Sequence, residues 1–116
     1  MTSPEIDQSH PPEHSGAAVE EKAWHALAAL PDPETGVGMV AMGLVYGVEF
    51  SPDSRRITVR MTLTTPACPM SGALQDGVRR AVSALPEVEE VRVELVFDPP
   101  WTPARVSEEG RRQLGW

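Results

Sequence analysis

Residues 56–64 alternate apolar and polar side chains without interruption, which is the period of a strand with one buried face. The apolar positions are Ile57, Val59, Met61 and Leu63, and the positions expected on the opposite face are Thr58, Arg60, Thr62 and Thr64. A similar alternation at 44–50 runs through Leu44, Tyr46, Val48 and Phe50. The intervening Ser51-Pro52-Asp53-Ser54 is typical of a turn with proline at its first central position. The two segments predict an antiparallel hairpin whose apolar face must be covered.

Two helical segments can supply that cover. Apolar residues recur at helical spacing over 18–30 (Val19, Ala23, Ala26, Leu27, Leu30) and over 71–85 (Leu74, Val78, Ala81, Val82, Leu85). A third strand is expected at 88–97, where Val91, Val93, Leu95 and Phe97 alternate with charged residues. The order helix–strand–strand–helix–strand predicts an α+β two-layer sandwich, with two helices on one face of a three-stranded sheet.

The chain has 116 residues, which is enough for one domain. Its formal net charge of -7 at pH 7 argues against nucleic-acid or anionic-membrane partners. Residues 1–17 are acidic and proline-rich, and we expect them to form a disordered tail before a single domain at 18–116. A C-terminal arm at 98–116 carries Trp101, Leu114 and Trp116 and should fold back onto that domain. The chain shows no apolar segment of about 20 residues, no signal-peptide pattern and only one thiol, so a cytoplasmic location is expected.

The single cysteine, Cys68, lies between the clearest strand and the second helix. Proline favours the first helical position, so Pro69 places Cys68 at or near the helix N-cap. Backbone N–H groups there stabilise a thiolate and lower the pKa of a cysteine. A functional thiol is therefore favoured over a small buried apolar side chain, which is the alternative. The chain contains no glycine-rich phosphate loop, no Ser/His/Asp arrangement and no paired-cysteine motif.

Three other features are candidates for the same site. Asp32-Pro33-Glu34 is most simply a turn capped by Asp32, although it could bring a carboxylate near Cys68 as a ligand, base or hydrogen-bond acceptor. Gly43 suits a positive φ or a close backbone approach. Trp101 is interpreted first as an anchor for the arm and second as a partner-docking residue.

Four motifs, taken in order along the chain, resemble the iron–sulfur cluster assembly domain family that includes the SufT and PaaD proteins. They are Asp32-Pro33-Glu34, Gly43-Leu44-Val45-Tyr46, Thr62-Leu63-Thr64-Thr65-Pro66-Ala67-Cys68-Pro69 and Asp98-Pro99-Pro100-Trp101-Thr102-Pro103. The resemblance implies the same order of helices and strands. It also implies a role as carrier, scaffold or targeting adaptor in iron–sulfur protein maturation.

The resemblance maps the family's reactive cysteine onto Cys68 and its acidic turn onto Asp32 and Glu34, with Thr64, Thr65 and Pro69 as supporting residues. Two departures from the family pattern are visible. Ala41 and Met42 stand where members often carry an acidic residue, and no cysteine follows Cys68, which makes the chain more similar to the SufT type.

An iron–sulfur cluster normally takes about four thiolate or equivalent ligands, and this chain has one cysteine. Any metal ligation by Cys68 is therefore expected to be transient or shared between chains, with no other cofactor. The expected partners are the assembly machinery, apo client proteins and, in one arrangement, a second copy in a homodimer. Two alternatives to a non-enzymatic assembly factor stay open. One is a thiol-dependent transfer enzyme with Cys68 as nucleophile and Asp32 or Glu34 as base; the other is an interaction module with a structural cysteine.

Overall fold

The computed structural model describes residues 16–64 and 71–116, which form three α-helices and three strands. In chain order these are α1 (Gly16–Ala28), β1 (Val45–Ser51), β2 (Arg56–Met61), α2 (Ser71–Ser83), β3 (Glu90–Leu95) and α3 (Glu108–Leu114), with a 3-10 helix (Pro103–Arg105) before α3. The predicted order of helices and strands is confirmed. Because α1 begins at Gly16, residues 16 and 17 belong to the helix and not to the tail; the rest of the predicted tail lies outside the described residues.

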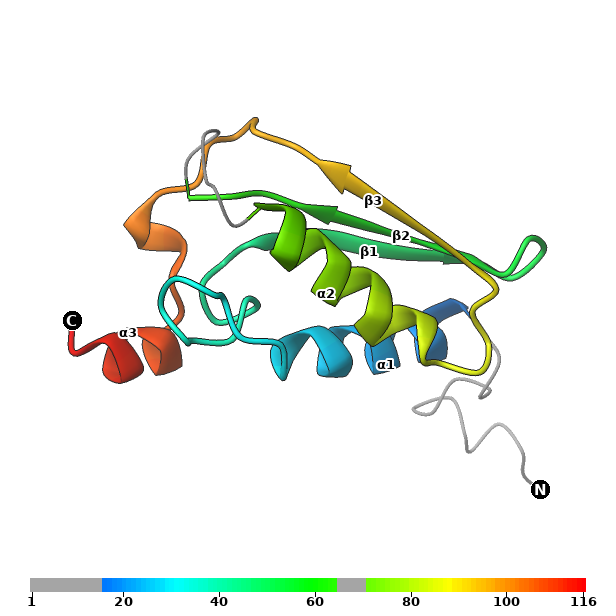
Figure 1. Cartoon of the computed structure of the whole chain (residues 1–116), viewed down its shortest axis with the longest axis horizontal. Coiled ribbons are helices and arrows are strands. Elements are labelled where there is room, and N and C mark those ends of the chain that lie inside the picture. Colours follow the sequence, from blue (N-terminus) through cyan, green and yellow to red (C-terminus); the bar gives the residue numbers. More distant parts are fainter. Residues whose placement is uncertain (1–15, 65–70) are drawn as a thin grey trace, which may run out of the picture.

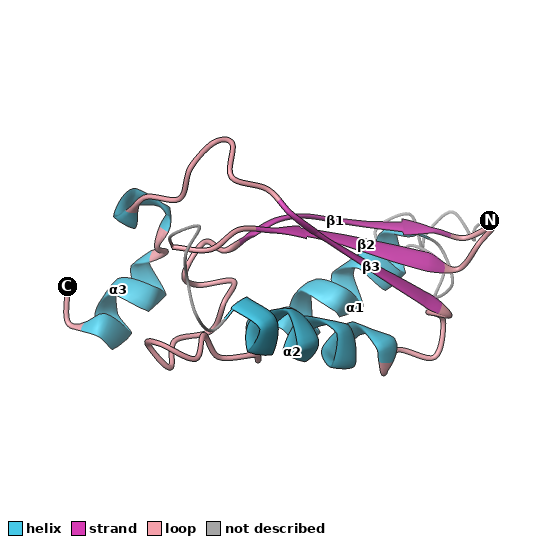
Figure 2. Cartoon of the chain, turned by 45° about the horizontal axis from the view of Figure 1, so that its top comes forward, coloured by secondary structure: helices cyan, strands magenta, loops and turns pink. Residues whose placement is uncertain are grey.

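The sheet has the order β1-β2-β3, with β1 antiparallel and β3 parallel to the central β2. Helix α1 packs against β1 and α2 against β3, so both helices cover the same face of the sheet (Figures 1 and 2). The core between the two layers is made of aliphatic side chains and methionines. Its fully buried members include Val19, Leu27, Met39, Met42, Leu44, Ile57, Val59, Met61, Val78 and Val82.

Three positions depart from the strict alternation that the sequence suggests. A β-bulge lies between Val45 and Gly47, so Val45 pairs with Met61 and Tyr46 leaves the row of core-facing residues. Strand β2 ends at Met61, and both residues after it are buried, so Thr62 is 0% exposed where a solvent-facing residue was expected. Strand β3 ends at Leu95, and Phe97 lies past it, 41% exposed and outside the core.

The C-terminal arm folds back along the loop that precedes β1. Val106 is buried in the core, and the Ser107 N–H donates to the Ala41 carbonyl at 2.8 Å. The Ser107 side chain caps α3 by accepting from the Gly110 N–H. Trp116 differs from expectation because it is 59% exposed. None of the helices in residues 16–64 and 71–116 is long and apolar enough to cross a membrane.

Candidate functional site

The segments singled out from the sequence gather at one end of the sheet. The end of β2, the start of β1, the chain after β3, the loop 29–44 and the start of α2 all lie at the end opposite the β1–β2 turn (Figures 1 and 2). We call this end the strand-end site. Of the predicted residues, Thr64 is half-buried three residues after the end of β2, whereas Thr65, Cys68 and Pro69 lie outside the described residues. Their segment connects Thr64 to Ser71, the first residue of α2.

Asp32 is buried, with 4% of its surface exposed, and its carboxylate is used within its own turn. Its Oδ2 accepts hydrogen bonds from the Thr35 N–H (3.2 Å) and the Thr35 hydroxyl (2.9 Å). The turn is closed by the Gly36 N–H, which donates to the Asp32 carbonyl at 2.7 Å. Glu34 is exposed on the outside of the same turn. The two carboxylates thus do different things: Asp32 shapes the loop, and Glu34 is available to solvent and to partners.

The Gly43 motif and the Trp101 motif, far apart in sequence, contact each other. The Trp101 indole Nε1 donates to the Met42 carbonyl at 2.7 Å, which ties the arm to the loop before β1. Gly43 has φ 78, and its Cα faces the Arg105 backbone, which confirms both the positive φ and the close approach expected from the sequence. Trp101 is half-buried against the core, a geometry that suits the anchor interpretation; docking of a partner at Trp101 stays a prediction.

A second contact between the arm and the sheet has no counterpart in the sequence patterns. The Tyr46 hydroxyl donates to the Pro99 carbonyl at 2.8 Å, and the Arg105 guanidinium lies 4.6 Å from the Tyr46 ring centroid. The bulge in β1 makes this possible because it takes Tyr46 out of the core row. A cation over an aromatic face is attracted by the ring quadrupole, so the contact between Arg105 and Tyr46 also stabilises the packing of the arm against β1.

Thr62 is a polar residue that sequence reasoning misplaced. Its N–H donates to the Leu44 carbonyl at 2.8 Å, while its buried Oγ1 has no hydrogen-bond partner among the described residues. A buried hydroxyl without a partner costs about 1–3 kcal/mol. Thr62 therefore places a buried polar atom just beyond the end of β2.

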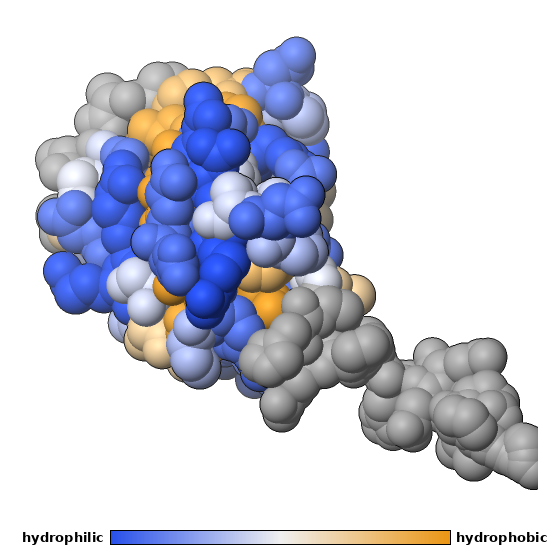
Figure 3. Space-filling model, turned by 90° about the vertical axis from the view of Figure 1, so that its right-hand side faces the viewer, coloured by the Kyte–Doolittle hydropathy of each residue, from blue (hydrophilic) through white to orange (hydrophobic). Residues whose placement is uncertain are grey.

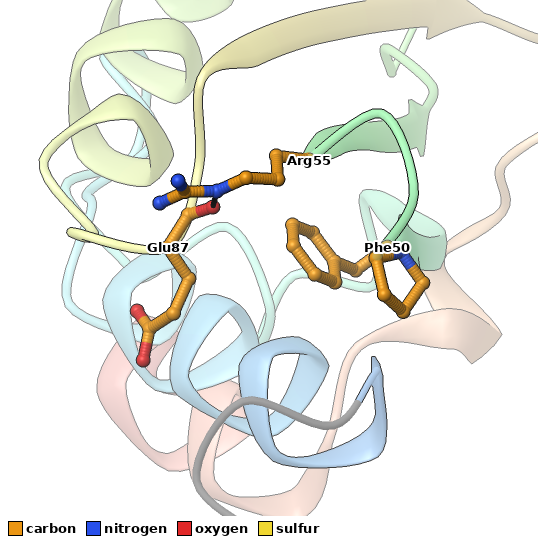
Figure 4. A pocket seen from close by; sticks show the side chains of 4 residues that line it. Phe50, Arg55 and Glu87 are labelled. Atoms are coloured by element: carbon orange, nitrogen blue, oxygen red, sulfur yellow. Dashed lines mark hydrogen bonds between the residues drawn. The ribbon is translucent and has the colours of Figure 1, made fainter.

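A cavity of about 280 Å³ lies at the other end of the molecule, beside the β1–β2 turn (Figure 4). That end is mostly hydrophilic at its surface (Figure 3). Arg55, which has φ 55, lines the cavity with Phe50, Pro52 and Glu87 and donates to the Pro86 and Glu87 carbonyls, each at 2.9 Å. The Glu87 carboxylate is 2.6 Å from the Lys22 ammonium. These polar groups hold the entry to β3 in place.

The described residues contain no group of three or more His, Cys, Asp or Glu side chains that could hold a metal ion. His25, the histidine of α1, is exposed.

Comparison with known proteins gives consistent matches. A family model described as iron–sulfur cluster assembly protein matches residues 20–95. The Fe-S protein maturation auxiliary factor YitW of Bacillus subtilis is 39% identical over 98 residues, covering 84% of this chain and 95% of YitW. The Fe-S protein maturation auxiliary factor SufT of Staphylococcus aureus is 39% identical over 84 residues, covering 72% of this chain and 94% of SufT. A crystal structure of a domain of unknown function from Bacillus anthracis superposes with a TM-score of 0.82 at 37% identity, covering 90% of this chain and 98% of that one.

Proposed function

Since this chain belongs to the iron–sulfur cluster assembly protein family, we propose that it is an auxiliary factor in the maturation of iron–sulfur proteins and that it works through the Cys68 thiol. The observation that carries the proposal is the family match over residues 20–95, together with relatives named as auxiliary maturation factors that align along 94% or more of their length. The proposed role is accessory and non-enzymatic, in the reducing cytoplasm, where a lone thiol stays free.

The cluster in this proposal is cargo, and the chain alone does not supply enough thiols to hold it. About four thiolate or equivalent ligands are normal, and the sequence contains one cysteine. Transient ligation by Cys68, completed by thiols of an assembly protein or a client, is therefore the proposed mode. This makes the chain a carrier or scaffold within a complex. If no cluster is bound, the chain would instead act as an adaptor that brings an assembly protein and a client together without contacting iron.

The strand-end site has features that suit such a complex. The Asp32 carboxylate holds the 32–37 turn through Thr35, which supports its proposed role as a supporting residue, and the exposed Glu34 is proposed as the acidic group that meets a partner. Phe97, 41% exposed at the same end, offers apolar surface for a client or an assembly protein. Thr64, Thr65 and Pro69 are proposed to shape the chain on either side of the thiol.

The test is anaerobic reconstitution with ferrous iron and sulfide, in the presence of glutathione as a source of additional thiols. Wild type is compared with Cys68→Ala and with His25→Ala, a control that removes an exposed potential ligand on α1. Iron and acid-labile sulfide per chain are measured together with visible absorption. We expect wild type and His25→Ala to take up cluster equally and Cys68→Ala to take up none, with unchanged far-UV circular dichroism. Equal loading of Cys68→Ala would refute the role of this thiol, and absence of loading in all three would refute the carrier mode.

A further inference from the structure

Strand β3 forms an open edge of the sheet. It lies at the end of the order β1-β2-β3, and among the described residues only β2 pairs with it (Figure 2). The Glu90 N–H donates to the Arg55 carbonyl (3.2 Å) and the Val96 N–H to the Met61 carbonyl (2.9 Å). Backbone groups of alternate residues point to opposite sides of a strand. The even-numbered residues therefore bond to β2, and Val91, Val93 and Leu95 direct their N–H and C=O groups outward.

The opposite edge of the sheet is blocked, which makes the open β3 edge distinctive. The outward N–H of Phe50 in β1 donates to the Glu20 carboxylate of α1 at 2.9 Å. The bulge between Val45 and Gly47 also interrupts that edge. Bulges and side-chain cover are common protections against pairing with another chain. Among residues 16–64 and 71–116, no side-chain hydrogen bond reaches the outward backbone groups of β3.

The sequence of β3, Glu90-Val91-Arg92-Val93-Glu94-Leu95, is complementary to itself when it runs antiparallel to a copy about Val93. In that register Val93 faces Val93, Val91 faces Leu95, and Arg92 faces the Glu94 of the second copy. We propose that β3 pairs in this way with β3 of a second copy of this chain, joining the two three-stranded sheets into one continuous sheet.

The backbone and the charges select the same register. The outward-facing residues Val91, Val93 and Leu95 become the hydrogen-bonded pairs, while Arg92 and Glu94 fall at the closer, non-hydrogen-bonded positions where cross-strand side chains interact most. A shift of the two-fold axis by one residue, to Arg92, would place Arg92 against Arg92 and Glu90 against Glu94. Like charges directly opposite are destabilising, so that register is excluded. Val91, Val93 and Leu95 are half-buried in one copy, and pairing would cover them further.

The dimer has a geometric consequence for the strand-end site. Because the two β3 strands run in opposite directions, the strand-end sites of the two copies lie at opposite ends of the joined sheet. Each copy would therefore present its own site to its own partner, and this dimer would not bridge a cluster between the two sites. The proposal is independent of the proposed function, since pairing needs neither iron nor Cys68.

An edge of this length is a weak contact, so the test is sedimentation equilibrium of the full chain from about 10 µM to about 1 mM, without iron. We expect a reversible dimer in wild type. Arg92→Glu places a carboxylate at position 92 against the Glu94 of the second copy, in two symmetric pairs, and should raise the dissociation constant of the dimer by about tenfold or more. The charge swap Arg92→Glu with Glu94→Arg restores opposite charges and should return the affinity to within about threefold of wild type.

A backbone variant tests the pairing in another way. Val93→Pro removes an N–H that points outward, so the monomer keeps its bonds to β2, and circular dichroism should stay unchanged while the dimer is lost. A wild type that is still monomeric at about 1 mM would overturn the proposal, as would a swap variant no tighter than Arg92→Glu. A dimer that survives Val93→Pro would place the interface elsewhere and overturn it equally.

Discussion

Gly43→Ala tests whether the arm and the loop before β1 form one tightly fitted unit. Gly43 has φ 78, a left-handed conformation that costs an L-residue about 1–2 kcal/mol. A Cβ at this position would also overlap the Arg105 carbonyl oxygen and lie 2.7 Å from the Arg105 Cβ. Such overpacking typically costs about 1–3 kcal/mol, and a backbone atom is hard to displace. The free energy of unfolding should therefore fall by about 2–5 kcal/mol in total.

Gly36→Ala is the matched control. Gly36 has φ 76, so its replacement carries the same backbone cost, but within residues 16–64 and 71–116 no atom beyond its chain neighbours lies within 4 Å of a Cβ built there. The reduced freedom of the unfolded chain is also common to both variants and cancels in their difference. Urea unfolding should show Gly43→Ala to be less stable than Gly36→Ala by about 1–3 kcal/mol. Thermal unfolding should show a melting temperature at least about 4 °C lower for Gly43→Ala than for Gly36→Ala. Equal stability of the two variants would refute the close contact with Arg105.

Two further perturbations address the arm. Trp101→Phe keeps an aromatic ring but removes the hydrogen bond to the Met42 carbonyl, so urea unfolding should report a loss of about 1–3 kcal/mol in the free energy of unfolding. Trp116→Phe, at an exposed residue, should change the free energy of unfolding by less than about 0.5 kcal/mol. Equal effects of the two variants would contradict an anchoring role for Trp101. In α3, hydrogen bonds from Gln113 and Arg112 and the charge of Arg112 lower the pKa of Glu109, so its contribution to stability is full above the ordinary carboxyl pKa and is lost as pH falls through the lowered folded value. Titration of Glu109 by NMR should show its pKa rising in Gln113→Ala, and an unchanged pKa would contradict this cause.

The fold followed closely from local patterns because both layers are built from regular periodicities. The alternation at 56–64 predicted β2, and the helical spacing of apolar residues predicted α1 and α2 to within two residues at each end. The departures arose where a tertiary contact overrides the local period. The bulge at Tyr46 serves a contact with Pro99, 53 positions away, and Thr62 is buried by the path of the chain beyond β2. No local pattern in the sequence contains either contact.

The candidate site was predictable in its turn chemistry and less so in its packing. Asp32 could be recognised as a turn residue because Asp followed by proline and then glycine has well-known local hydrogen-bond preferences. That Trp101 would bond to Met42, or that Arg105 would lie over Tyr46, required the fold. Cys68 was identified from its neighbours in sequence, and its role is decided by the reconstitution experiment.

The hydrogen bond between Trp101 and Met42 spans 59 positions, which has a consequence for the order of events at the ribosome. The loop before β1 is synthesised early, but its carbonyl groups at Ala41 and Met42 receive their partners only when residues 101–107 have emerged. Contacts of such long sequence separation form late in folding. The strand-end site is thus completed by the last part of the domain to be made, so a nascent chain that lacks the arm would display an unfinished site to its partners.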